Sequence, residues 1–555
     1  MAVLLGRHSR HNFGLRLPTL RRALGVEVVA VLICALALAT HIPVQTALMV
    51  GIPLAVLPFV VFSGRTLLDW AITAFEYATG SVPPTGVTSD YTDPDGTTLG
   101  VHRLDSHVSS VLELRPSPGA TTRLGRSGAT SDCSLDLSML SHSLVQHDIS
   151  LSGITVVSYG ARTASGSPAT DVYEHLIGPL PAVASRTVWV TVTLDVRTNH
   201  HAVEARGGGH LGVHRTVSIA TQRVARALQA HGVESRILTR HEIRSAASDM
   251  CRGVSLDALT ENWRSAPLPG AIRTGFGFDC RALDDRALAD IWAVPALASS
   301  VVMRLSPTAT TDHVALSGSC GFVTRTIAPS PALADSVSMR GRQREALLTS
   351  LPLAITAPNR GDPVRDIPTA QVAAVRIPTS GCGQLLGSDS SGHGVAVRIH
   401  GPDLSSVHVA GELYLAQQLV FRAIATGARI LVRTDRPHAW GPLVDSVATP
   451  DRLRIEGGGH RTGTRTDLIV HDFSSEVDTP APFRHDRVTV LTLTELSPRT
   501  PMSDPDVSIV QPGAVGDRIR LRTQRSETEL VLVTIPQETA FIGRPRSLRQ
   551  AIGSY

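Results

Sequence analysis

The stretch that decides the fold is "TVWVTVTLDV" (187–196), which leads through "ARGGG" (205–209) into "IATQRVARALQAHGVESRILT" (219–239). Its first segment is a nearly continuous run of apolar and β-branched residues, which is typical of a buried strand. Behind the glycines, apolar residues recur every three to four positions until Gly232 ends the pattern, which predicts a helix. Strand, helix and a second strand over 235–239 predict a βαβ unit with a parallel pair of strands.

The same order of elements recurs in "SSVHVAGELYLAQQLVFRAIATGARILVRTDRPHAW" (405–440), where Gly427 ends the predicted helix and a strand covers 428–433. Upstream, we expect a loop over 116–131, because Gly, Ser and Thr dominate it, and a helix near 134–147. Further short apolar runs predict strands over 99–104, 108–114, 153–158, 467–471, 487–494, 506–510, 518–522 and 528–534. The sequence therefore predicts an α/β region with a parallel or mixed sheet and a strand-rich C-terminal part.

Composition excludes several classes of protein. The chain has 555 residues, of which 42% are hydrophobic and 18% charged, so most of it should be globular. A formal net charge of +4 is too small to predict nucleic-acid binding. All 52 basic residues are arginine, as expected from a GC-rich genome. Walker A loops and Schiff-base enzymes both require a lysine, so neither class fits.

The cysteine pattern predicts reduced, mostly buried thiols in a protein that is not exported. No C-x-x-C pair is present, which argues against a zinc ribbon and against a disulfide scaffold. The six cysteines are Cys34, Cys133, Cys251, Cys280, Cys320 and Cys382.

Two apolar stretches near the N-terminus, 23–42 and 44–63, each approach the ~20 residues that a helix needs to cross a bilayer. They predict a two-helix transmembrane hairpin that contacts the lipid bilayer. A signal peptide that ends at "ALA" (37–39) is one alternative, although the second apolar stretch follows almost at once. A buried soluble hairpin is another.

Arginine placement predicts the orientation of this hairpin. Five arginines precede the first stretch, Arg65 follows the second, and the connection between the stretches has none. By the positive-inside rule, the N-terminus and the large domain are then cytoplasmic, at the inner (plasma) membrane. Trp70 and Tyr77 mark either the membrane interface or a helix that packs on the domain.

We expect five regions along the chain. A turn-rich segment separates the membrane part from the globular part, and a segment rich in proline and charge reads as a linker between the two βαβ-like units. The predicted regions are an N-terminal tail with the hairpin (1–65), a membrane exit and linker (66–97), an α/β domain (98–355), a linker (356–379) and a second, α/β to β-rich region (380–555).

The glycine turn is the first candidate for a binding site. Gly207, Gly208, Gly209 and Gly212 nearly match the dinucleotide pattern G-x-G-x-x-G, but no acidic residue ends the next strand. We therefore favour a structural turn over a phosphate-binding loop. Nearby histidines lack the H-E-x-x-H pattern of a zinc site, which favours solvated side chains. They are His200, His201, His210 and His214.

Carboxylates give only weak pointers to chemistry. Two D-x-D pairs, Asp93/Asp95 and Asp504/Asp506, read "DPD" and favour turns over a metal site. Asp435 follows a predicted strand, where open α/β sheets place ligands. The sequence thus predicts no catalytic residue, no metal-binding residue and no cofactor.

Several segments together resemble the EccE family of type VII (ESX) secretion proteins of actinobacteria. In addition to the opening stretch, these are "YEHLIGPLP" (173–181), "LVQHDISLSGITVVS" (144–158), "MRGRQREALLTSLP" (339–352) and "GCGQLLGSD" (381–389). Shorter members of the family lack much of the region after about residue 350. The resemblance implies a non-catalytic membrane subunit that assembles with EccB, EccC and EccD type subunits, with ATPase activity in EccC.

Two other functions remain open. One is a membrane-anchored nucleotide-sugar enzyme of the glycosyltransferase type, and the other is a ligand sensor whose site lies near Asp435. Which ESX system the protein serves, and its stoichiometry, do not follow from the sequence.

Overall fold

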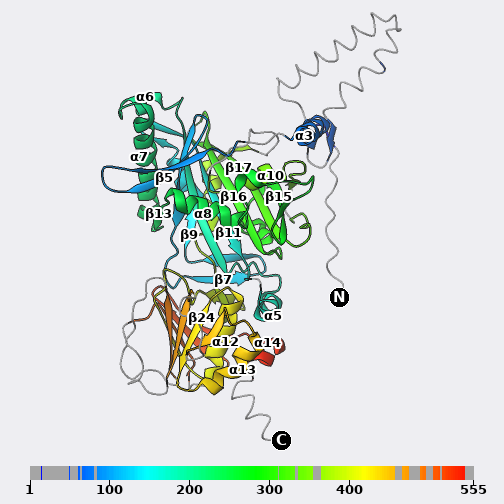
Figure 1. Ribbon diagram of the computed structural model, residues 1–555, viewed down its shortest axis with the longest axis vertical. Helices are drawn as coiled ribbons and strands as arrows, with labels where there is room; N and C mark the ends of the chain where they lie inside the picture. Colours follow the sequence, from blue (N-terminus) through cyan, green and yellow to red (C-terminus); the bar gives the residue numbers. More distant parts are fainter. Residues whose placement is uncertain are drawn as a thin grey trace, which may run out of the picture.

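A computed structural model describes residues 14–15, 49, 60–62, 65–80, 84–164, 166–310, 312–331, 336–353, 364–456, 465–473, 488–494, 504–512 and 516–543. These residues form two units stacked along the long axis of the molecule, each built on a large β-sheet (Figure 1). We call them the N-terminal unit and the C-terminal unit.

The N-terminal unit is built on a sheet in which all described pairings are antiparallel. Its main strands, in spatial order, are β14 (Ala266–Leu268), β15 (Ala271–Phe278), β17 (His313–Thr324), β16 (Ala298–Pro307), β11 (Ile149–Ala161), β12 (Ser185–Asp195), β6 (His107–Leu114), β5 (Thr98–Leu104) and β4 (Val87–Thr92). Four short strands attach to its sides: β10 (Val145–Gln146), β13 (Ser235–Ile237), β18 (Val337–Ser338) and β19 (Arg365–Pro368).

Helices cover both faces of this sheet, and the sheet lies between two apolar cores. On one face lie α4 (Leu137–His142), α7 (Gly209–Ala230) and α9 (Asp285–Trp292). The apolar stripe predicted for the helix behind the glycines is buried in that core as Val213, Val217, Ala220, Val224 and Leu228 of α7. The other face carries α8 (Arg240–Met250) and α10 (Gln343–Leu348). Both faces of the sheet are therefore removed from water, which explains its long runs of apolar residues.

The C-terminal unit is built on a mixed sheet. Six strands run parallel: β25 (Leu453–Ile455), β24 (Ile430–Thr434), β26 (Leu468–Asp472), β27 (Thr489–Thr494), β23 (Ser406–Ala410) and β28 (Val507–Val510). Antiparallel strands continue it: β29 (Arg518–Thr523), β30 (Glu527–Leu532), β21 (Gln384–Ser388), β22 (Gly394–Val397), β7 (Thr121–Gly125) and β8 (Gly128–Ser131).

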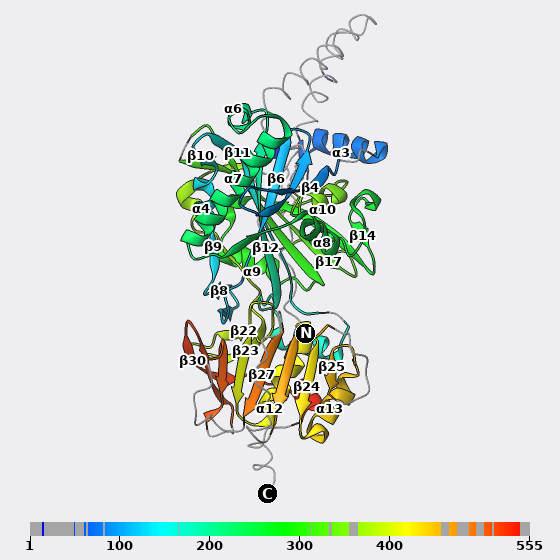
Figure 2. The same ribbon diagram turned by 60° about the vertical axis from the view of Figure 1, so that its left-hand side comes forward.

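One face of the mixed sheet is covered by α12 (Leu413–Ala425), which packs with α5 (Pro168–Ile177), α13 (Pro437–Val447) and α14 (Pro536–Ile542). In Figure 2 the strands stand in front of these helices. Every residue of α12 from Tyr414 to Ala425 is buried. A helix that is buried all round belongs to the centre of a fold, and α12 is the centre of this unit.

The chain passes between the two units several times. From the N-terminal half, β7, β8 and α5 join the C-terminal unit, while the chain between them returns to the first sheet. A separate pair of strands, β9 (Ser134–Asp136) and β20 (Arg376–Pro378), joins segments that are far apart in the sequence. The two units are thus interlocked and are not two consecutive, separate segments of the chain.

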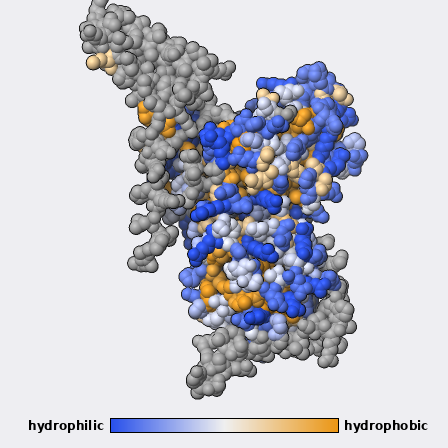
Figure 3. Space-filling model, turned by 180° about the vertical axis from the view of Figure 1, so that it is seen from behind, coloured by the Kyte–Doolittle hydropathy of each residue, from blue (hydrophilic) through white to orange (hydrophobic). Residues whose placement is uncertain are grey.

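A third, small sheet precedes the large ones. It consists of β1 (Gly14–Leu15), β2 (Val60–Phe62) and β3 (Arg65–Thr66), and it leads directly into α3 (Leu67–Thr79). The side chain of Thr66 accepts from the backbone of Asp69 and the side chain of Asp69 accepts from Thr66, which forms a capping box at the start of α3. Apolar surface is visible where α3 lies in the view from behind (Figure 3).

The predicted fold class is wrong in its strand pairing. Strands β12 and β13, predicted to be a parallel pair, do not pair with each other. Both pair with β6 in antiparallel register, so they run in the same direction with β6 between them. The order strand, helix, strand correctly predicts that β12 and β13 run in the same direction. It does not predict that β6, from earlier in the chain, lies between them.

The structure also contradicts the predicted transmembrane hairpin. Within the described residues, no helix combines the length and the apolar composition that crossing a bilayer requires. Nearly all of 23–63 lies outside the described residues. At its end, Val60–Phe62 forms strand β2, in which Val61 and Phe62 pair with Thr66 and Arg65 of β3.

Individual elements agree better with the sequence analysis. The five apolar runs after residue 450 coincide with β26, β27, β28, β29 and β30. The predicted loop over 116–131 was wrong, since it contains β7 and β8. Only the middle of the predicted helix 134–147 is helical, as α4. Within the predicted linker 356–379, the described part forms β19, a turn of helix and β20.

A buried ion pair fixes α12 in the C-terminal unit. Arg422 of α12 and Glu538 of α14 both have side chains only 1% exposed, and Arg422 Nε lies 2.7 Å from Glu538 Oε1. Arg422 also donates to the carbonyl oxygens of Leu385 (2.7 Å) and Leu386 (3.2 Å) in β21. One guanidinium group therefore joins two helices and the sheet.

We expect Glu538→Gln to destabilise the C-terminal unit by about 3–5 kcal/mol, because it leaves Arg422 buried and unpaired. Glu529→Gln is the control: Glu529 pairs with Arg520 at 3.3 Å on the surface, so its loss should cost less than about 1 kcal/mol. Native-state hydrogen exchange of the full chain, read on peptides from α12 and β21, measures both. Equal effects of the two substitutions would contradict this assignment.

Candidate functional site

The glycine turn connects two helices, α6 (His200–Glu204) and α7. Gly207, Gly208 and Gly209 all have positive φ angles, which explains the choice of glycine. The backbone N–H of Gly207 donates to Glu204 O (3.0 Å), and that of Gly208 donates to Val203 O (3.0 Å). Both amides are thus used inside the turn and are not free to bind a phosphate.

The surroundings of the turn also disfavour an anion. A Cβ atom at Gly208 would lie 3.0 Å from a carboxylate oxygen of Glu204, so a negative charge stands at the start of α7. A phosphate would be repelled from this helix N-terminus. At Gly212, a Cβ would lie 2.4 Å from Val203 O, so this glycine allows α6 and α7 to approach closely. The residues serve a helix-to-helix turn.

The four histidines around the turn do not converge on one point. The rings of His200 and His201 lie 3.9 Å apart, while His210 Nδ1 is 3.1 Å from Arg103. His214 packs on the ring of Tyr91, and burial, together with His210 and Arg103, lowers the pKa of His214. Across the described part of the chain, no group of three or more His, Cys, Asp or Glu side chains is arranged to hold a metal ion.

The first "DPD" pair is a turn with a structural carboxylate. Asp93 Oδ1 accepts hydrogen bonds from the backbone N–H groups of Asp95 (3.1 Å) and Thr97 (3.0 Å). Its Oδ2 accepts from Ser218 Oγ (3.3 Å) and Gln222 Nε2 (2.6 Å) of α7. Asp93 thereby ties the β4–β5 hairpin to α7.

The second pair serves a similar purpose. Asp506 Oδ2 accepts from the backbone N–H groups of Ser405 (2.8 Å) and Ser406 (3.0 Å), which lie at the start of β23. Asp504 is exposed, 3.7 Å from Arg522. In the second pair, the two carboxylates therefore contact different partners.

The carboxyl edge of the parallel strands holds a carboxylate that the sequence analysis missed. Asp435 was the candidate there, but the buried acid is Asp472, which ends β26 and is 1% exposed. Its oxygens accept from Thr434 Oγ1 (3.0 Å), Arg436 Nη2 (2.6 Å) and Trp440 Nε1 (2.7 Å). An aspartate directly after the strand predicted over 467–471 was the available signal. Three side chains of the protein thus occupy the place where open α/β sheets bind ligands.

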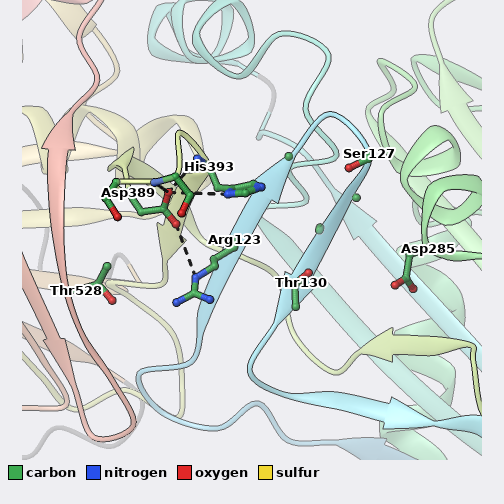
Figure 4. Close-up of a pocket in the computed structure, with 12 residues that line it drawn as sticks. Arg123, Ser127, Thr130, Asp285, Asp389, His393 and Thr528 are labelled. Atoms are coloured by element: carbon green, nitrogen blue, oxygen red, sulfur yellow. Dashed lines mark hydrogen bonds and ion pairs between the residues drawn. The ribbon is translucent and has the colours of Figure 1, made fainter.

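A polar cavity of about 530 Å³ lies between the two units (Figure 4). The β7–β8 hairpin, the β21–β22 loop and β30 line it from the C-terminal unit, and the start of α9 lines it from the N-terminal unit. Its lining residues are Arg123, Gly125, Ser127, Gly128, Ala129, Thr130, Asp285, Asp389, Ser390, Ser391, His393 and Thr528.

Asp389 organises this cavity. Its Oδ1 accepts from the backbone N–H groups of Ser391 (2.9 Å) and His393 (3.0 Å). Arg123 Nε lies 3.9 Å from its Oδ2, and His393 Nδ1 lies 3.9 Å from its Oδ1. Both Arg123 and His393 are more than half exposed, so these ion pairs are weak. Sequence reasoning missed the cavity because its walls come from four separate segments of the chain.

We predict that Gly212→Ala destabilises the α6–α7 turn by about 1–3 kcal/mol, because its methyl group would meet the backbone oxygen of Val203. Gly441→Ala in α13 is the matched control: nothing lies within 4 Å of its Cβ position, so alanine should stabilise that helix by about 0.5–1 kcal/mol. Hydrogen exchange of peptides from each helix tests both. The same sign of change at the two positions would be the contrary result.

Comparison with known proteins finds sequences similar to this chain. A family model described as "Putative type VII ESX secretion system translocon, EccE" matches residues 182–278, which include β12, α6, α7, β13, α8 and β15. The matched region therefore contains strand β12, the glycine turn (207–209) and helix α7.

Curated relatives extend the match. The ESX-2 secretion system protein EccE2 of Mycobacterium tuberculosis (strain CDC 1551 / Oshkosh) is 25% identical over 446 residues, 78% of each chain. The ESX-1 secretion system protein EccE1 of M. tuberculosis (strain ATCC 25618 / H37Rv) is 28% identical over 196 residues, 33% of this chain and 42% of the relative. EccE1 of Mycolicibacterium smegmatis is 28% identical over 143 residues, 25% of this chain and 31% of the relative. By its sequence, the chain is similar to the EccE proteins of type VII ESX secretion systems.

Proposed function

We propose that this protein is a non-catalytic subunit of a type VII (ESX) protein secretion complex, in which it contributes to the assembly or stability of the inner-membrane machine. The observation that carries the proposal is the match to an ESX-2 EccE protein over 78% of both chains. A match of this length includes both structural units and exceeds what a shared local motif explains.

The chemistry of the candidate sites supports a role without catalysis. Asp472 is satisfied by Arg436 and Trp440, and the glycine amides bond within their own turn. Burial raises the pKa of Cys280 and of Cys320 to about 12, so neither is a thiolate at neutral pH. Each of these groups performs a structural task.

The described part of the chain supports a position on the cytoplasmic side of the inner membrane. Its five cysteines are free thiols, and four of them are buried. Free thiols are typical of a reducing compartment. The proposed partners are EccB, EccC and EccD type subunits, and the small net charge of +4 supports no role in nucleic-acid binding.

Affinity purification tests this proposal. The tagged full chain, taken from detergent-solubilised membranes of its own cells, should co-purify with EccB, EccC and EccD type subunits at levels well above those of an unrelated tagged membrane protein. Recovery of the chain without any of these subunits, under conditions in which the subunits co-purify with each other, would contradict it.

Calorimetry tests the absence of a nucleotide site. We expect no binding in the micromolar range when ATP, NAD or a UDP-sugar is titrated into the full chain, because the crevice at the carboxyl edge is occupied by Arg436 and Trp440. Micromolar binding of a UDP-sugar that Asp472→Asn abolishes would instead support the nucleotide-sugar enzyme.

A further inference from the structure

The helix α3 carries Thr73 and its two aromatic side chains with a polar atom, Trp70 and Tyr77, on the side that faces the protein. Thr73 is fully buried against Gly341, where a Cβ atom would lie 2.7 Å from Thr73 Cγ2. The rings of Trp70 and Tyr77 lie 6.1 and 5.2 Å from the ring of Trp263. Trp70 and Tyr77 thus pack on the N-terminal unit, as one of the two alternatives in the sequence predicts.

Both acidic residues of α3 lie on this same side. Asp69 takes part in the capping box with Thr66, and Glu76 Oε2 lies 3.8 Å from Arg342 Nη2. Arg65, just before the helix, is 3% exposed and donates to the backbone oxygen of Arg340 (3.4 Å). The docked side therefore contains all the charges of the helix.

The opposite side of α3 is apolar and open. Residues spaced by three and four positions share one side of a helix, and here they are Leu68, Ala71, Ile72, Phe75, Ala78 and Thr79. The hydroxyl group of Thr79, at the end of the helix, donates to the backbone oxygen of Phe75 (3.0 Å). Phe75 is 69% exposed and Ile72 is 37% exposed. Orange surface of this helix is visible in Figure 3. The usual arrangement, with the apolar stripe packed on the protein and the polar side in water, is reversed.

This reversal indicates an apolar neighbour for α3. The 20 residues of "VQTALMVGIPLAVLPFVVFS" (44–63) contain no charged residue, so α3 closely follows a strongly apolar part of the chain. At their end, Phe62 in β2 is 41% exposed. A helix of 13 residues is about 20 Å long, too short to cross a hydrocarbon core of ~30 Å, but it can lie along the surface.

Arginines beside the docked side suit a lipid surface better than an apolar groove of another protein. Arg264 adjoins Trp263 in sequence and is exposed, and Arg340 is half-buried next to Arg65. Interfacial helices combine an inserted apolar side with basic groups that meet anionic headgroups. We propose that α3 lies along the surface of a lipid bilayer, with Leu68, Ile72 and Phe75 at the acyl boundary, and so holds the N-terminal unit against the membrane.

Depth-dependent quenching in vesicles tests this proposal independently of the secretion role. The full chain, with Cys34→Ser and Cys133→Ser, is labelled with a fluorophore at Phe75→Cys and reconstituted into vesicles of phosphatidylcholine with a minor fraction of phosphatidylglycerol. The control label is at Val145→Cys, because Val145 in β10 is 65% exposed and lies away from α3. Nitroxide lipids should quench the label at 75 about threefold more than the label at 145, and aqueous iodide should quench the label at 145 more.

Strong quenching of the label at 75 by iodide, with none by nitroxide lipids, would overturn the proposal. The apolar side of α3 would then contact a protein partner or water. A second pair of variants checks that the apolar side is responsible. With the label at Ala78→Cys, Phe75→Asp should reduce lipid quenching about threefold and Phe75→Leu should preserve it. Phe75 does not face the docked side, so both variants keep the contacts with Trp263. Unchanged quenching in Phe75→Asp would contradict the proposal.

Discussion

Buried carboxylates set the conditions under which this chain folds, because an unpaired charge in the interior is strongly unfavourable. Glu538 meets this requirement with Arg422, and Asp472 meets it with Arg436 and Trp440. Burial raises the pKa of Asp279, but hydrogen bonds from Arg281 and Arg365 outweigh it and lower this pKa to about 2. In each case the partner is an arginine, whose planar group can bond to a carboxylate and to nearby backbone oxygens together.

These internal partners explain why a fold with parallel strands lacks an evident ligand site in its described part. Arg436 and Trp440 occupy the carboxyl edge of β24 and β26, where related architectures hold a nucleotide. The polar cavity between the units lies elsewhere, under the β7–β8 hairpin that the N-terminal half of the chain contributes. The internal bonds of this edge agree with the structural role that we propose for the protein, and the similarity to EccE proteins of ESX secretion systems supports that proposal.

Individual helices and strands could be predicted from the sequence, but the strands with which they pair and the helices against which they pack could not. The apolar stripe of α7 and the strand runs after residue 450 follow from periodicity, which depends only on nearby residues. The insertion of β6 between β12 and β13 depends on a segment far away in sequence, so the fold class was wrong. Strands β7 and β8 were missed because small polar residues dominate their sequence. They form strands because they pair at the edge of the sheet of the C-terminal unit, most of which comes from much later in the chain. Asp472 was missed because its partners lie on other elements.

The central claim is that the carboxyl-edge carboxylate belongs to the protein's own structure. A double-mutant cycle between Arg436 and Asp472 tests it most directly, with Arg436→Met, Asp472→Asn and the double variant compared by hydrogen exchange of peptides from β24 and β26. Because Asp472 is 1% exposed, we expect a coupling energy of about 2–3 kcal/mol. A coupling energy near zero would show that Arg436 does not stabilise the buried carboxylate of Asp472. This result would contradict the account, because Asp472 could then bind a ligand.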